Sequence, residues 1–275
     1  MTNSNTNMEL LRPAQRPGRP QPRFQMLRVI VALMLREIST TYGRSAAGYL
    51  WAILEPLAGI AFFSLIFSLI QNRPSLGTIF PLFYATGVLP FMMFNELSVK
   101  IAQSIRFSQP FMAYPNVTWV DVILARLILN VLKDLLVYAI VIVSIFVIYN
   151  ATEQVDMLAL LGSVGMITFL AAGVGTLNCY LMTAYPAWER IWAILTRPLF
   201  LMSGVFYLYG TMPREAQNVL WYNPLIHIVG QMRHAIYSTY DAAYVSPFYV
   251  CALSSVTLFF GVLLLSRHFR LLMEK

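Results

Sequence analysis

Charged side chains are scarce in this sequence. Only 11% of its 275 residues are Asp, Glu, Lys or Arg, whereas 58% are hydrophobic. A soluble domain usually carries about 25% charged residues, so water is not the solvent for most of this chain. The apolar residues come in blocks of about 20, the length that a helix needs to cross a hydrocarbon core of about 30 Å. Such solid blocks exclude the alternating pattern of a membrane barrel and predict an all-α integral membrane protein.

Cysteine is scarce as well. The two cysteines, Cys179 and Cys251, have no neighbours at metal-ligand spacing. The expected spans place them near opposite faces of the membrane, farther apart than the Cα separation of about 7 Å that a disulfide allows. We therefore expect two unpaired cysteines that pack as small core side chains.

Phosphate-binding and catalytic motifs are missing. No GxxxxGK[ST] loop occurs, and the three histidines (His227, His234 and His268) are scattered. Matching halves with interrupted spans are also missing, which argues against inverted-repeat carriers. We expect no catalytic residue, cofactor or metal on this chain, and no ATP hydrolysis by the chain alone.

The N-terminal region contains no apolar core of a signal peptide. Residues 1–23 are polar and rich in Pro and Arg, which predicts a disordered cytoplasmic tail. Residues 24–48 are too charged to span a bilayer and too apolar to be a free helix. An amphipathic helix lying in the interface satisfies both properties. A helical extension of the first span is the alternative.

Six apolar segments predict six transmembrane helices in a single domain over residues 24–270. A short cytoplasmic tail, residues 271–275, follows. The expected spans are residues 49–70, 79–99, 122–149, 157–183, 191–209 and 247–266.

The basic residues are distributed unevenly over this layout. Thirteen Lys and Arg residues fall in the segments on the N-terminal side of the membrane, and three fall in the opposite loops. Because cytoplasmic segments carry the excess of positive charge, both termini are expected in the cytoplasm. The same distribution explains the net charge of +7 without any binding of nucleic acid.

The third span is the least apolar one. Arg126, Asn130, Lys133 and Asp134 form one stripe along it, one turn or two apart, and Asp121 lies at its start. Such residues normally face the bundle interior and pair with one another. They predict an internal salt-bridge seam, which is slightly preferred here, or the lining of a conduit.

Two loops are longer than the topology requires. The inner loop, residues 100–120, has an amphipathic first half followed by a segment bounded by prolines. The outer loop, residues 210–246, is dense in apolar and aromatic residues but is broken by Asn223, Pro224 and Gly230. Two short half-helices that dip back into the membrane fit this outer loop. A surface loop with an amphipathic helix is the alternative, which the density of apolar residues disfavours.

Several runs of sequence carry a family resemblance. The run MLREISTTYGRSAAGYLWAILEPLAG resembles the N-terminal signature of type-2 ABC exporter permeases for surface polysaccharides. Its part GYLWAILEP is similar, more narrowly, to the capsular polysaccharide export permeases of Gram-negative bacteria. Further matches are GVLPF at residues 87–91 and NPLIH at residues 223–227. The resemblance covers residues 27–270.

This resemblance implies a permease subunit of the bacterial inner membrane that exports an anionic, lipid-linked capsular polysaccharide. It implies a homodimer that binds two copies of a separate cytoplasmic ABC ATPase, on which ATP and Mg are held. A periplasmic polysaccharide co-polymerase and an outer-membrane export channel are the further implied partners.

The resemblance also implies roles for individual residues. Contact with the ATPase is implied for Gln109, Pro110, Phe111, Met112, Ala113, Tyr114, Asn116, Tyr185 and Arg190. A place at the substrate entrance or conduit is implied for Arg28, Arg36, Arg44, Trp51, Glu55 and Phe62. Closure of the outer exit is implied for Trp221, Tyr222, Asn223 and Pro224.

Other functions fit parts of these observations. The same architecture exports O-antigen, teichoic acid or small drugs. A membrane acyltransferase or glycosyltransferase would need a carboxylate site, for which only Asp121, Asp134 and Glu55 are available. A scaffold protein would need no ATPase.

Overall fold

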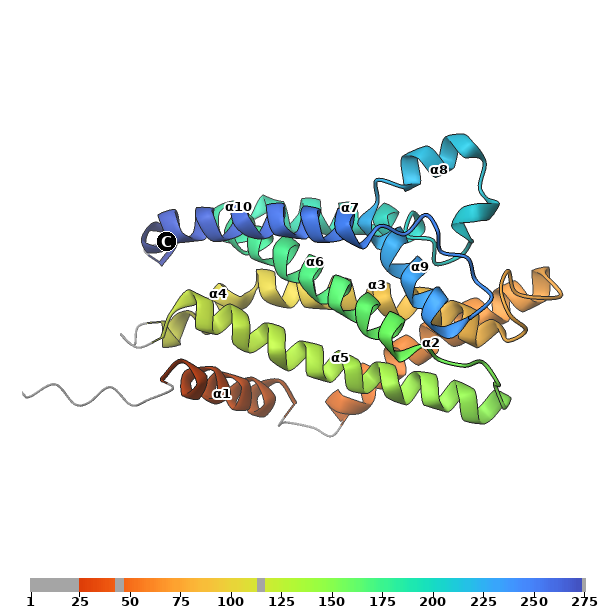
Figure 1. The fold of residues 1–275 in the computed structure, drawn as a ribbon. Helices are drawn as coiled ribbons and strands as arrows, with labels where there is room; N and C mark the ends of the chain where they lie inside the picture. Colours follow the sequence, from red (N-terminus) through yellow and green to blue (C-terminus); the bar gives the residue numbers. More distant parts are fainter. Residues whose placement is uncertain (1–24, 43–46, 113–116, 274–275) are drawn as a thin grey trace, which may run out of the picture.

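The computed structural model describes residues 25–42, 47–112 and 117–273. These residues form helices and connecting loops, with no strand among them, so the expected all-α membrane fold is confirmed (Figure 1). The expected tail at residues 1–23 lies outside the described residues. Residues 271–273, expected at the start of the cytoplasmic C-terminal tail, continue the last helix, and their place in the cytoplasm stays a prediction.

Five helices are long and apolar enough to cross a membrane. They lie side by side: α2 and α5 run in one direction along the bundle, and α3, α6 and α10 run in the other (Figure 1). Their bounds are α2, Ala47–Ile70; α3, Phe80–Ala102; α5, Trp119–Tyr149; α6, Met157–Ala184; and α10, Pro247–Met273.

Helix α7 (Ala187–Leu201) occupies the place of the fifth expected span, residues 191–209, but ends early. Its 15 residues give a length of about 22 Å, shorter than a hydrocarbon core. The expectation that this helix continues to residue 209 was wrong, because residues 202–208 are irregular. A side chain from later in the chain hydrogen-bonds the backbone of this segment: Asn223 Nδ2 donates to the Met202 carbonyl at 3.0 Å. A sixth membrane crossing by this segment stays a prediction.

Helix α3 is the centre of the bundle. In its most apolar window 78% of the residues are buried, compared with 11% for α2. Helices α6 and α10 pack backbone to backbone at Gly173 and Gly261. A Cβ added at Gly173 would lie 2.5 Å from the Ser254 carbonyl oxygen, and one at Gly261 would lie 2.6 Å from the Leu177 nitrogen. Small residues at such contacts let membrane helices approach closely.

One end of the bundle, which we call the basic end, contains three short elements and the C-terminal turns of α10 (Figure 1). They are α1 (Gln25–Glu37) with its π-helical end η1 (Ile38–Tyr42), α4 (Ser104–Ser108) and the 3-10 turn η2 (Gln109–Phe111). Helix α1 packs against α5, and α2 begins separately at Ala47. Cys179 is buried in this half of α6, whereas Cys251 is exposed and not a core residue; neither forms a disulfide.

The opposite end, which we call the α9 end, contains η3 (Tyr209–Thr211), α8 (Arg214–Leu220) and α9 (Pro224–Ile236) (Figure 1). Helix α9 is largely buried against α6 and α3. Helix α8 stands away from the bundle, and most of its side chains are exposed (Figure 1). Of the two half-helices expected in this loop, only α9 lies inside the bundle. Its re-entry into a membrane stays a prediction.

Candidate functional site

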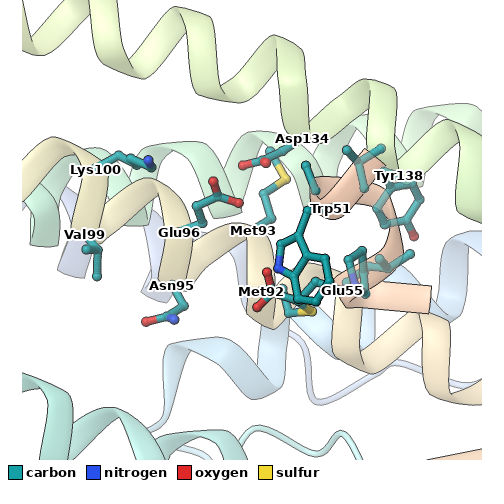
Figure 2. Close-up of a pocket in the computed structure, with 14 residues that line it drawn as sticks. Trp51, Glu55, Met92, Met93, Asn95, Glu96, Val99, Lys100, Asp134 and Tyr138 are labelled. Atoms are coloured by element: carbon teal, nitrogen blue, oxygen red, sulfur yellow. The ribbon is translucent and has the colours of Figure 1, made fainter. Parts of the chain in front are cut away.

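A cavity of about 630 Å³ lies between α2, α3 and α5 (Figure 2). Trp51 and Glu55 contribute from α2, Asn95 and Glu96 from α3, and Asp134 from α5. Figure 2 shows Glu96 and Asp134 facing one another, with the Trp51 ring across the space. This volume lies within the range of about 300–1,000 Å³ that is typical of ligand sites.

A charged cluster holds the α3 and α5 walls of this cavity together. The Lys133 ammonium hydrogen-bonds the Glu96 carboxylate and lies 3.0 Å from Asp134 Oδ1. Asp134 lies about midway along α5 and is only 8% exposed. Buried charges normally require such pairing. The polar stripe expected on this helix is therefore both a salt-bridge seam, at Lys133, and a cavity lining, at Asp134.

A second cavity, of about 620 Å³, lies between α3 and α7. It shares Asn95 and Val99 with the first cavity, so the two flank one stripe of α3. On the α7 side it is lined by Thr196 and Arg197, and Arg197 is exposed. A guanidinium in the middle of an apolar helix requires water or a polar partner, which makes this face unsuitable for lipid.

The residues expected at the conduit are dispersed along α1 and α2. Trp51 and Glu55 line the first cavity. Phe62 lies two turns farther along the same face of α2 and is 58% exposed, outside both cavities. Arg28 is exposed on α1, and Arg44 lies outside the described residues.

Arg36, the remaining expected entrance residue, points instead at the inner loop. Its guanidinium carbon lies 3.6 Å from the centroid of the Phe111 ring and 5.1 Å from that of Phe107. The guanidinium carbon of Arg126 also lies over the Phe107 ring, 4.1 Å from its centroid. Cations over aromatic faces are attracted by the ring quadrupole, so these contacts tie α1 and α5 to the loop.

A buried ion pair reinforces this connection. Arg126 Nε donates to Glu37 Oε2 at 3.2 Å, and another Arg126 nitrogen donates to the Lys100 carbonyl at 2.8 Å. Both side chains of the pair are less than a tenth exposed. Arg126 therefore pairs with α1 and not with the other members of its own stripe, contrary to the expectation that those residues pair among themselves.

The residues expected to contact an ATPase lie at the basic end. Gln109 and Pro110 are exposed, whereas Phe111 and Met112 are half-buried. Tyr185 is exposed at the turn between α6 and α7, and Arg190 is exposed in the first turn of α7. Ala113, Tyr114 and Asn116 lie outside the described residues.

The two expected ATPase-contact segments are joined through Arg106 of α4. Its guanidinium lies 2.8 Å from Glu189 Oε2 in α7 and also donates to the Met182 carbonyl of α6. The inner loop and the α6–α7 turn consequently form one surface at the basic end.

The residues expected at the outer exit form the start of α9. Asn223 caps this helix, since its Oδ1 accepts from the Leu225 nitrogen at 3.0 Å. Pro224 is the first helical residue, where its missing N–H costs nothing. Trp221 packs edge-on against His227, and Tyr222 is 69% exposed.

His227 fixes the turn between α8 and α9. Burial lowers the pKa of its imidazole. The neutral ring bridges two backbone groups: Nε2 lies 2.8 Å from the Trp221 carbonyl, and Nδ1 accepts from the Ser246 nitrogen at 3.2 Å. This arrangement holds the segment after α8 against the segment before α10.

Arg233 is the largest side chain that is fully buried. It donates to the carbonyls of Tyr207 at 2.8 Å and Val205 at 3.1 Å, and its guanidinium lies 4.5 Å from the Phe83 ring centroid. Among the described residues no carboxylate lies within ion-pairing distance of it. Arg233 thus donates hydrogen bonds to the backbone carbonyls of the irregular segment that follows α7.

Sequence reasoning missed three of these groups: Glu37, Glu96 and Arg233. Glu96 carries the signal that singled out Glu55, a carboxylate inside an apolar span. Arg233 lies in a segment whose apolar density implied burial, so a buried cation could have been suspected there. No local pattern pointed from Glu37 to Arg126, which is 89 residues away.

Asp121 and Asp134 lie too far apart to form the paired site that a transferase would need. Asp121 belongs to the cap of α5, where its carboxylate accepts from the Thr118 nitrogen at 2.9 Å. Asp134 lies 13 residues farther along the same helix, which places it about 20 Å away. Within the described ranges no group of three His, Cys, Asp or Glu side chains is arranged to hold a metal ion.

Comparison with known proteins identifies the family. Residues 28–237 match the model of the ABC-2 type transporter family. The polysialic acid transport protein KpsM of Escherichia coli is 31% identical over 242 residues, which cover 88% of this chain and 94% of that protein. The capsule polysaccharide export inner-membrane protein CtrC of Neisseria meningitidis serogroup B is 28% identical, with 87% and 91% covered. The protein BexB of Haemophilus influenzae, described in the same words as CtrC, is 26% identical, with 80% and 83% covered. The chain is therefore a member of the ABC-2 type transporter family.

Proposed function

We propose that this chain is the permease subunit of an ATP-driven exporter that moves capsular polysaccharide across the inner membrane. The observation that carries the proposal is a mostly polar stripe of α3, formed by Asn95, Glu96, Val99 and Lys100, which is flanked by one cavity toward α2 and another toward α7. A polar, hollowed surface at membrane depth serves the passage of a hydrophilic substrate. The names of KpsM, CtrC and BexB supply the substrate class.

The working unit is a homodimer. Helices α2 and α7 flank the polar stripe, yet α2 is barely buried and none of the α7 side chains is buried. Arg197, Glu189 and Arg190 on α7 are unsuited to lipid. A second copy placed across these helices would enclose the stripe, with each chain contributing half of the wall.

The basic end is the cytoplasmic end and docks the ATPase. Arg28 and Arg36 of α1, Lys100, Arg106 and Arg190 gather there, as the excess of positive charge in cytoplasmic segments requires. The surface formed by residues 109–112 and the α6–α7 turn takes the partner ATPase, which holds ATP and Mg. Because Arg106 joins these two segments, movement of one is transmitted to the other.

The α9 end then faces the periplasm. Trp221, Tyr222, Asn223 and Pro224 lie at the exit, next to the co-polymerase and outer-membrane channel of a capsule system. The substrate is an anionic, lipid-linked glycan that approaches past the exposed arginine of α1, Arg28.

Deletion of the gene tests the proposal. Loss of surface capsule, together with accumulation of lipid-linked glycan inside the cell, is the expected result. Replacement of residues 109–116 by a Gly/Ser segment should likewise abolish export while leaving the chain in the membrane.

Two outcomes would count against the proposal. Capsule that persists on the deletion strain would remove the export function. Loss of a different surface glycan would leave the permease role intact and overturn the capsular substrate.

A further inference from the structure

The cavity between α2, α3 and α5 is acidic, which is unusual beside a path for an anionic polymer. The carboxylates of Glu55, Glu96 and Asp134 line it, and Lys100 is the one basic residue of the lining. The ammonium of Lys133 lies next to the cavity but is held by Glu96 and Asp134. Three carboxylates against two ammonium groups do not attract the acidic groups of a glycan.

One oxygen of this cluster is left without a partner. Asp134 Oδ1 lies 3.0 Å from the Lys133 ammonium, whereas Asp134 Oδ2 is buried and has no hydrogen-bond partner among the described residues. A buried acceptor without a donor costs about 1–3 kcal/mol. Since the last torsion of an aspartate is soft, a small rotation presents either oxygen to the cavity. The site lacks a donor, not a cation.

A metal ion is a poor candidate for this place. The ammonium of Lys133 already occupies the position between the two carboxylates where a cation would bind. Hydroxyl groups, in contrast, donate to a carboxylate without displacing the ammonium.

An aromatic face completes the site. Trp51 lines the cavity from α2 and is 64% exposed, so its ring is available for contact. An aromatic ring offers apolar contact to the CH face of a sugar, while the hydroxyls at the rim of the sugar reach polar groups. Asn95, farther along the same wall, has an amide that both donates and accepts.

We propose that this cavity is a subsite for the uncharged, hydroxyl-bearing face of a sugar ring. Asp134 and Glu96 accept hydrogen bonds from the hydroxyls, and Trp51 contacts the apolar face. The inference rests on the proposed export function and sharpens it, because the transporter then recognises hydroxyl patterns and not the negative charge of the glycan.

Photo-cross-linking in capsule-producing cells tests this subsite in the full complex. The photoreactive residue p-benzoylphenylalanine is placed at Trp51, and a matched control carries it at Leu132, which lies on the exposed face of α5 and is 56% exposed. The readout is native capsular glycan attached covalently to the chain after irradiation. We expect attachment at position 51 and none at position 132.

The variants Asp134→Asn and Glu96→Gln then test the hydroxyl contacts. Each should lower the yield at position 51 about tenfold, since a hydrogen bond to a charged acceptor is weakened. The yield is normalised to the membrane level of each variant and to the co-purified ATPase, so that the effect of losing a Lys133 ion pair on folding is separated from loss of the hydroxyl contact. In isolated membranes the yield should change little between low and high salt.

The possible failures are distinguishable. Three results would each overturn the subsite. The first is a yield in both variants equal to that of the chain with Asp134 and Glu96 intact. The others are a steep fall of the yield with salt, or attachment at position 132 but not at 51. Capsule export would continue in those cases. Capsule that is exported without this chain would overturn the proposed function itself.

Discussion

The two ends of the bundle each bury an arginine, and they neutralise it differently. At the basic end Arg126 faces the Glu37 carboxylate, at 3.2 Å, and the Phe107 ring. At the α9 end Arg233 faces two backbone carbonyls and the Phe83 ring. The first arginine joins two regular helices, α1 and α5. The second joins α9 to backbone that is not helical.

This difference separates an exchangeable contact from a required one. A buried ion pair between helices can often be replaced by apolar residues of similar volume, because two desolvated charges cost nearly what they gain. Carbonyls of irregular backbone cannot be replaced, since apolar surroundings offer them no other donor. The basic end should therefore tolerate redesign, whereas the α9 end should not.

The largest effect is expected for Arg233→Met. The change leaves the carbonyls of Val205 and Tyr207 without donors and should destabilise the chain by about 3–5 kcal/mol. Thermal unfolding in detergent and the level of protein in the membrane measure the loss. Arg214→Met on exposed α8 is the control, and it should leave both quantities unchanged.

Arg233→Lys sharpens the same result. Lysine keeps the charge but lacks the planar fork that serves two acceptors, so only partial recovery is expected. Full stability of Arg233→Met would show that the carbonyls find other donors, and the contrast between the two ends would disappear.

An intermediate effect is expected for Glu37→Gln. The amide oxygen can still accept from Arg126 Nε, but the buried guanidinium loses its opposite charge, at a cost of about 2–3 kcal/mol. The double change Glu37→Leu with Arg126→Met removes both charges and should recover stability to within about 1 kcal/mol of the native chain. A double variant that is no more stable than Glu37→Gln would contradict the view that this pair is exchangeable.

A smaller effect on stability is expected for Phe111→Ala. An aromatic ring beneath Arg36 contributes about 0.5–1 kcal/mol, but its loss frees the inner loop from α1. Export per ATP hydrolysed, measured with the partner ATPase in proteoliposomes, should fall more than stability does. Gln109→Ala, an exposed neighbour in the same turn, serves as the control for a general disturbance of the loop. If export per ATP hydrolysed does not change, the contact between α1 and the inner loop has no part in coupling.

The smallest effect is expected for the exposed pair Arg106 and Glu189. Both side chains are more than a third exposed, and such pairs contribute about 0–1 kcal/mol. A double-mutant cycle with Arg106→Ala and Glu189→Ala should give a coupling energy in this range that decreases with salt. A coupling energy as large as that of Arg126 and Glu37 would mean that solvent exposure does not explain the difference in strength between the two ion pairs at this end.

Much of the fold follows from local sequence. Helices α3, α5, α6 and α10 lie close to the expected apolar segments because each segment has the length and composition that lipid demands. Helix α7 departs from its expected range because its end depends on Asn223 and Arg233, which lie far along the chain. Local hydropathy contains no information on such distant donors.

The candidate site was predictable only in part. Trp51 and Glu55 were expected on a conduit wall and do line a cavity, since a carboxylate near the start of an apolar span is a signal in itself. Phe62 was expected beside them and lies outside both cavities. Glu96 was overlooked, and Arg36 packs on Phe111 where an open entrance was expected.

The amino-acid sequence by itself determined that lipid is the surroundings of most of the chain, that the fold is helical, and that positive charge is distributed unevenly. Each of these follows from composition and from runs of consecutive residues. Only the tertiary structure decided which polar groups meet: Glu96 with Lys133, Glu37 with Arg126, and Arg233 with the carbonyls after α7. The physical reason is that burial obliges every charge to find a partner, whereas helix packing decides which partner is within reach.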